Sequence, residues 1–116
     1  MSSHDVLTKA RHLLSGKKKW CSGVIAQFVD ATKNVPCDPQ YLYATQWCAM
    51  GALRKYDWHD ETSAMETLRK VCHEKHGYSI MSANDLLGWE VILDCLDAAI
   101  VVALQNETPV LGHHSE

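Results

Sequence analysis

The chain has 116 residues, a net charge of −3 and 47% hydrophobic residues, which is typical of one globular domain and excludes a generally disordered chain. With 11 basic and 14 acidic residues, the charge balance gives no indication of a nucleic-acid-binding surface, and the basic run 17–19 is too short to follow a phosphate backbone. The longest apolar run, 98–104, is too short to span a membrane, and the N-terminus lacks a secretory signal. Five cysteines without a C-x-x-C pair favour a reduced, cytoplasmic protein.

The first third of the chain predicts a helix followed by a β-hairpin. Ser2, with an aspartate three residues later, resembles a capping box, and apolar residues at helical spacing follow, so residues 3–15 are expected to be helical. Within residues 20–37 two alternating sets of side chains precede a D-A-T-K-N turn, which predicts a short hairpin. Because an isolated hairpin is only marginally stable in water, we expect this one to pack on helices.

The middle of the chain predicts a central helix over residues 39–55. Asp38 followed by Pro39 is a typical helix start, with an N-cap and then proline at the first helical position. The residues that follow, Leu42 included, are apolar over most of the circumference of a helix, which indicates a central element rather than a surface one. On this helix Cys48 lies well past the first turn.

Two more helices complete the prediction. Asp60 is expected to cap a helix over residues 61–76, and residues 86–105 are expected to form the last helix. The sequence therefore predicts a mainly α protein: a compact four-helix domain over residues 1–105, with a short β-hairpin between the first and second helices. Residues 106–116 are expected to be a flexible tail.

Several of these residues form a pattern that resembles a known family. W-C-A-M-G-A-L at 47–53 and S-A-N-D at 82–85 are similar to the W-C-A-x-G-A-L and W-N-D motifs of a family of small uncharacterised bacterial and phage proteins. Further matching positions are Trp20 and Gly23, Asp38 and Pro39, and Glu90 and Val91. The similarity covers residues 6–100, although Ala83 stands where the family usually has tryptophan. Because that family is a domain of unknown function, the resemblance implies an architecture and no mechanism.

Cys48 is the first candidate for chemistry. A nucleophilic cysteine needs a cation or a helix N-terminus that stabilises its thiolate, together with some exposure. The other members of a Cys-His-Asp arrangement would be His59, His73 or His76 as the base, with Asp85 or Asn84 to orient it. The simpler interpretation, which the pattern favours, is that Cys48 is a small buried side chain that lets another helix approach closely.

Asn84 and Asp85 form a polar pair before the last predicted helix. They could hold a small ligand in a pocket together with Trp20 and Trp47. The simpler interpretation is that they cap the last helix by accepting hydrogen bonds from its first N–H groups. A third interpretation is that the pair hydrogen-bonds across to the central helix and locks the two elements together.

A metal site has little support in the sequence. Cys72 and His76 are four residues apart and would share one helix face, which supplies two ligands where zinc needs three or four. Cys37, Cys48 or His59 could complete the set, but none stands at a recognised spacing. We therefore expect no metal and no other cofactor.

The last predicted helix carries more apolar surface than a small domain is expected to cover. Val91, Cys95, Ala98 and Val102 could meet a partner, with a twofold homodimer as the simplest such contact; alternatively, the hairpin and the first helix cover them. The leading hypothesis is a non-enzymatic module that binds a protein partner as a homodimer, by analogy with small phage regulators and inhibitors. The alternatives are a cysteine-dependent hydrolase or transferase that uses Cys48, and a small-ligand binder.

Overall fold

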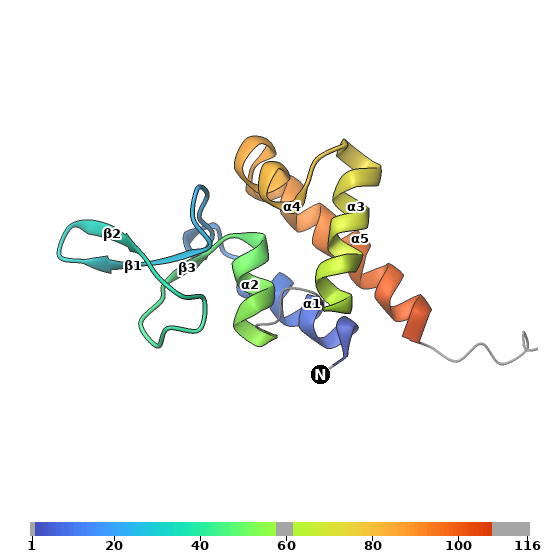
Figure 1. Cartoon of the computed structure of the whole chain (residues 1–116), viewed down its shortest axis with the longest axis horizontal. Coiled ribbons are helices and arrows are strands. Elements are labelled where there is room, and N and C mark those ends of the chain that lie inside the picture. The colour runs from blue at the N-terminus through green and yellow to red at the C-terminus, as the bar shows by residue number, and fades with distance from the viewer. Residues whose placement is uncertain (1, 58–61, 108–116) are drawn as a thin grey trace, which may run out of the picture.

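The structure, a computed structural model, describes residues 2–57 and 62–107, which form a helical body with a small sheet projecting from one end (Figure 1). In this part of the chain there are five α-helices, a 3-10 helix (η1), a π-helix (η2) and three strands. Their bounds are α1 Ser3–Leu13, η1 Lys17–Lys19, β1 Ala26–Asp30, β2 Lys33–Pro36, β3 Gln46–Trp47, α2 Ala49–Tyr56, α3 Ser63–His76, α4 Ile80–Ser82, η2 Ala83–Leu87 and α5 Trp89–Glu107. The mainly α prediction is confirmed, but the prediction of four helices is wrong.

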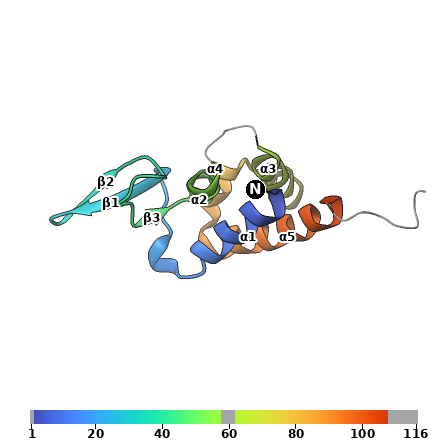
Figure 2. The same ribbon diagram turned by 90° about the horizontal axis from the view of Figure 1, so that it is seen from below.

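The helical body is built around α5, which packs against both α1 and α3, while α2 packs against α1 (Figure 2). Apolar residues of α5 recur at three- and four-residue intervals on its inner side, as expected for a helix that buries one face. The largest fully buried apolar side chains of the described residues are Val6, Leu7, Leu14, Leu53, Met65, Leu68, Ile80, Ile92 and Leu96. One core therefore joins α1, α2, α3, α4 and α5.

α1 and α3 begin and end within two residues of their predicted bounds, which were 3–15 and 61–76. The hydroxyl oxygens of Ser2 and Thr62 each accept a hydrogen bond of 3.1 Å from the backbone N–H three residues later, at the starts of α1 and α3. Gly77 ends α3 with a φ of 76°, a left-handed conformation that glycine adopts without steric cost. Asp60, the predicted cap of this helix, lies outside the described residues.

The predicted helix over residues 39–55 is wrong in its first half. Asp38 begins a turn instead, because Tyr41 N–H donates to its carbonyl oxygen at 3.0 Å and Gln40 N–H donates to its carboxylate at 2.7 Å. Aspartate followed by proline favours a β-turn as well as a helix start. The helix in this region, α2, begins only at Ala49.

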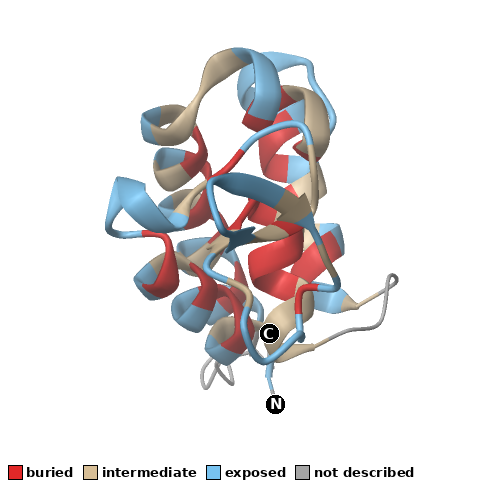
Figure 3. Cartoon of the chain, turned by 90° about the vertical axis from the view of Figure 1, so that its left-hand side faces the viewer, coloured by how far each residue is buried: buried red, intermediate tan, exposed pale blue. Residues whose placement is uncertain are grey.

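The sheet contains the predicted hairpin and one strand that was not predicted. β1 pairs antiparallel with β2, with Phe28 opposite Val35, and β1 also pairs with β3, so the strand order is β2-β1-β3. Ala31, in the two-residue turn between β1 and β2, has a φ of 58°. Figure 3 looks at this sheet end-on and shows exposed strands in front of the buried residues of the body.

The last helix begins later and ends later than predicted. The predicted range was 86–105, whereas α5 covers Trp89–Glu107 and follows directly on η2 and Gly88, whose φ is 95°. Asn84 and Asp85 lie within η2, so they do not cap α5 as the simpler interpretation held. Of the predicted tail, the first two residues continue α5 and residues 108–116 lie outside the described residues.

Candidate functional site

Asn84 is the buried polar centre of the junction between the sheet and the helical body. Its side-chain oxygen accepts hydrogen bonds from Trp20 Nε1 and from Ala49 N, each at 2.9 Å. Its amide nitrogen donates to the carbonyl oxygen of Cys21 at 3.1 Å and to Asp85 Oδ1 at 3.0 Å. An asparagine side chain has two donors and one two-fold acceptor, so Asn84 is fully satisfied within the chain. Of the three interpretations of this pair, the structure shows the third, a hydrogen bond to the central helix, because Ala49 is the first residue of α2.

Asp85 continues this network to the segment before β1. Its Oδ1 also accepts a hydrogen bond of 3.0 Å from Gly23 N, and its side chain is otherwise exposed. Asn84 and Asp85 together therefore bind residues 20–23, which lie more than sixty residues earlier in the chain, and Ala49, which lies 35 residues earlier. These hydrogen bonds hold η2 against the segment that precedes β1.

Cys48 is the N-cap of α2 and not a mid-helix residue as predicted. Its sulfur accepts a hydrogen bond of 3.3 Å from Gly51 N, while its backbone N–H donates to Ile25 O at 3.0 Å. A Cβ added to Gly51 would lie 2.0 Å from that same Ile25 oxygen. The close packing of α2 against the chain before β1 therefore requires glycine at this position, while Ala49 N is capped by Asn84.

The chemistry of Cys48 follows from its burial. Its side chain is 0% exposed, and burial raises the pKa of the thiol despite the hydrogen bonds from backbone N–H groups, which lower it. In the part of the chain that the structure describes, no histidine is hydrogen-bonded to Cys48, and His73 and His76 lie exposed in the last turn of α3. His59 lies outside the described residues. This environment stabilises a neutral thiol rather than a nucleophilic thiolate.

The tryptophans of the predicted ligand pocket are engaged inside the protein. Trp47 is buried, and its Nε1 donates to Pro39 O at 2.9 Å, while Trp20 is half-buried and bound to Asn84. Lys55 Nζ lies 5.0 Å from the centroid of the Trp47 ring, which is within the range of a cation–π contact. The side-chain polar groups of Trp20, Trp47 and Asn84 are thus hydrogen-bonded within the fold.

Comparison with known proteins gives one match. A family model described as a family of unknown function, DUF6197, matches residues 1–102. The chain belongs to the DUF6197 family. No curated protein and no solved structure matches it. The predicted membership of a family of unknown function is confirmed, and within this DUF6197 chain the matched residues include the whole junction around Asn84.

The cysteines of the DUF6197 chain are all free thiols. Burial raises the pKa of Cys21 to about 12 and that of Cys72 to about 12. Cys72 faces Cys95 across the contact of α3 with α5, while His76 is exposed. Among residues 2–57 and 62–107, no group of three or more histidine, cysteine or acidic side chains could hold a metal ion.

The predicted interface residues do not form one surface. Cys95 is fully buried inside the chain, so it cannot contact a partner while α5 packs in the body. Val91 and Ala98 are half-buried, and Val102 is exposed. The sequence left open whether these four residues meet a partner or are covered within the chain, and Cys95 is covered because it packs against Cys72 of α3.

A groove of about 520 Å³ lies between the start of α1, the outer side of α3 and the end of α5. Its walls include Ser63, Thr67 and Lys70 on α3, with Val102 and Asn106 on α5. None of the predicted ligand-binding residues lines it. No described helix is long and apolar enough to cross a membrane.

Leu42, the most exposed large apolar side chain of the described residues, lies in a loop of the projecting sheet that was not predicted as a site. In the loop between β2 and β3, Tyr41 is 42%, Leu42 82% and Tyr43 65% exposed. The ring of Tyr41 lies 5.1 Å from that of Phe28 and 5.7 Å from that of Tyr43. We name these four residues the arm patch. The run Y-L-Y directly after a D-P turn is the signal that could have identified it, but the prediction of a helix placed Leu42 on a buried face.

Proposed function

We propose that the protein is a non-enzymatic protein-interaction module and that the arm patch is its contact surface. The observation that supports this function is the exposure of three consecutive large side chains, Tyr41, Leu42 and Tyr43, on a part of the fold that projects from the body. Tyrosine and other aromatic residues are enriched at the cores of protein interfaces. A contiguous exposed apolar surface of this kind is typical of a binding site for another macromolecule.

The loop that carries the patch is held in place before any partner binds. Thr45 N–H donates to Gln27 O at 2.9 Å, and Gln40 Nε2 donates to the carbonyl oxygen of Arg54 at 3.0 Å. The Trp47 indole holds Pro39 at the other end of the loop. Because side chains on an ordered loop lose less conformational entropy on binding, the anchoring favours recognition by a preformed surface.

The alternatives have weaker support. A cysteine-dependent hydrolase requires an activated, accessible thiolate, whereas Cys48 is buried and its thiol pKa is raised by that burial. A ligand site around Trp20, Trp47 and Asn84 requires free polar groups, whereas those of the two indoles and of the amide are used within the fold.

The test compares the wild type with the double variant Leu42→Ser/Tyr43→Ser. Both proteins are immobilised and exposed to an extract of the cells from which the protein comes, and retained proteins are quantified by mass spectrometry. We expect at least one protein to bind the wild type and the control variant Leu86→Ser, which replaces an exposed leucine on η2, and to be lost from the double variant. The retained partner, once purified, should then bind the wild type and Leu86→Ser but not the double variant.

Self-association is measured on the same proteins by light scattering. A dimer that is abolished by Leu42→Ser/Tyr43→Ser makes the second copy the partner and supports the proposal. A set of retained proteins and an oligomeric state that are both the same for the wild type and the double variant would show that the arm patch is not a binding surface.

A further inference from the structure

We infer that the partner of the arm patch presents an acidic segment with a large apolar side chain. This inference rests on the proposed function and adds the chemistry of the partner. It comes from three lysines at the base of the sheet that carries the patch, which form no ion pair among the described residues.

Lys17, Lys18 and Lys19 form the short helix η1, and all three are exposed. Among the described residues, Arg11, Arg69 and Lys75 form ion pairs with carboxylates, and no ion pair involves η1. Three consecutive ammonium groups repel one another, and nothing in the described part of the chain neutralises them. They therefore form a concentrated positive surface on a chain with a net charge of −3.

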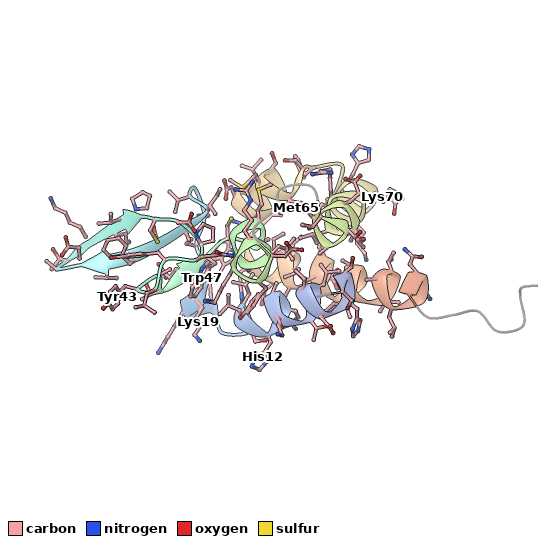
Figure 4. All side chains as sticks on the ribbon, turned by 60° about the horizontal axis from the view of Figure 1, so that its bottom comes forward. His12, Lys19, Tyr43, Trp47, Met65 and Lys70 are labelled. Atoms are coloured by element: carbon pink, nitrogen blue, oxygen red, sulfur yellow. The ribbon has the colours of Figure 1, made fainter. Side chains whose placement is uncertain are left out.

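The fold places this positive surface beside the sheet that carries the arm patch. Gln46 Nε2 donates to the carbonyl oxygen of Lys18 at 3.0 Å, and Trp20, which directly follows η1, forms a parallel bridge with Trp47 of β3. Gln46 comes three residues after Tyr43 in the same strand-and-loop segment. In Figure 4 the labelled residues Lys19 and Tyr43 both lie on the lower side of the sheet, Lys19 at its base and Tyr43 farther out.

The distribution of charge favours an acidic partner at this place. Because the whole chain is negative while η1 is positive, the rest of the surface is more acidic than the total, and it repels an acidic segment. The field around η1 attracts the same segment and orients it toward the arm patch, since complementary charges set the approach and the register of partners. Leu42 and Tyr43 then supply the apolar contact that the charges alone lack.

A single-stranded nucleic acid fits this surface less well. Such ligands require a basic groove along several nucleotides and aromatic rings on which bases stack. Here the positive charge is confined to three residues, and the most exposed residue of the patch, Leu42, offers no ring. An acidic segment of a protein needs only a short basic surface next to an apolar one.

The test uses two short fluorescein-labelled peptides that share the same leucine and phenylalanine positions. One peptide carries glutamate and the other lysine at every remaining charged position, and binding to the full chain is followed by fluorescence anisotropy at low and at high salt. We expect the acidic peptide to bind about 10-fold more tightly than the basic one, and this preference to weaken with salt. The variant Lys17→Glu/Lys18→Glu/Lys19→Glu should reverse the preference while its urea midpoint stays unchanged.

Several outcomes would overturn the inference: equal binding of the two peptides, binding of neither, a preference that survives charge reversal, or tighter binding of oligothymidylate than of the acidic peptide. Equal binding that is lost in Leu42→Ser/Tyr43→Ser overturns the acidic partner and leaves the proposed function standing. If the arm patch retains no protein and supports no self-association, the inference of an acidic partner and the proposed function are both overturned.

Discussion

The side chain of Asn84 caps α2 from another part of the chain, because its oxygen accepts a 2.9 Å hydrogen bond from the backbone nitrogen of Ala49. Helix N-termini are usually capped by the residue that precedes them, and here Cys48 fills that role for Gly51. The start of α2 is thus capped twice, once locally by a thiol and once by a buried amide from η2. The position of α2 therefore depends on the position of η2.

Replacement of Asn84 by alanine should destabilise the fold strongly. The change leaves Ala49 N, Trp20 Nε1 and Cys21 O without their partners, and the loss should exceed about 2 kcal/mol because each unsatisfied buried group costs about 1–3 kcal/mol. The free energy of unfolding is measured with urea. The control Asn34→Ala, at an exposed position of β2, should change it by less than about 0.5 kcal/mol. Similar effects of the two changes would refute the role given to Asn84.

Gly51→Ala should destabilise the protein although alanine is the better helix former. The added Cβ would lie 2.0 Å from Ile25 O, so the helix and the chain before β1 must move apart, at a cost of about 3 kcal/mol or more. The matched control is Gly16→Ala, where a Cβ meets no atom within 4 Å. Thermal unfolding followed by circular dichroism compares the two, and a Gly51→Ala protein as stable as the control would contradict the close approach.

Ala31→Gly should stabilise the hairpin. Ala31 is the first of the two turn residues and has a φ of 58°, which costs a residue with a Cβ about 1–2 kcal/mol and glycine almost nothing. After the greater flexibility of glycine in the unfolded chain is subtracted, we expect a gain of about 0.5–1 kcal/mol. Thr32→Gly, at the next position, should bring no gain, and urea midpoints of both variants decide the question.

The thiols should differ in their reactivity toward iodoacetamide at neutral pH. Cys37 is half-buried, whereas Cys21, Cys48, Cys72 and Cys95 are buried, and a buried neutral thiol reacts slowly. Peptide mapping by mass spectrometry should find Cys37 modified first and Cys48 modified only at the rate of unfolding. Rapid labelling of Cys48 in the folded protein would return support to the cysteine-dependent enzyme.

Alkaline pH should destabilise the fold through Cys21. Burial raises the pKa of this thiol from 9.0 to about 12, so the folded chain retains a proton that the unfolded chain releases above pH 9. The stabilisation is fully present below pH 9 and is lost as the pH rises toward 12, by about 1.4 kcal/mol for each pH unit. The stability difference between the wild type and Cys21→Ala, measured in urea, should therefore shrink by about 1.4 kcal/mol between pH 8 and pH 10. A constant difference would contradict the raised pKa.

The elements with unambiguous local signals were predictable. α1 has the predicted serine cap, α1 and α3 both have a regular apolar face, and α3 ends at a left-handed glycine. The hairpin has alternating strands and a short turn. The predicted and observed bounds of these helices agree to within two residues, because local hydrogen bonds alone decide where they start and stop.

The region around Cys48 could not be predicted because its signals have two meanings. Asp38 with Pro39 favours a turn and a helix start equally, and only the pairing of β3 with β1 decides for the turn. The two residues of β3 are too few to show a strand period. The position of Cys48 as a cap, and with it the correct view of its chemistry, depends on this non-local pairing.

The candidate site was predicted in part. The bond from Asn84 to the central helix was among the interpretations that the sequence allowed. The other partners of Asn84, Trp20 and Cys21, lie far away in the chain and have no local signal. The arm patch was missed because Leu42 matches an apolar helix face only if that helix exists.

Each described tryptophan carries a hydrogen bond from its indole to a different junction: Trp20 to Asn84, Trp47 to Pro39 and Trp89 to the carbonyl oxygen of Leu14. These junctions join η2 to the segment before β1, the loop before β3 to β3 itself, and the start of α5 to the end of α1. The intrinsic fluorescence of these three of the four tryptophans therefore reports on three separate junctions. Variants that keep one of these tryptophans at a time would reveal the order in which the three junctions separate during unfolding.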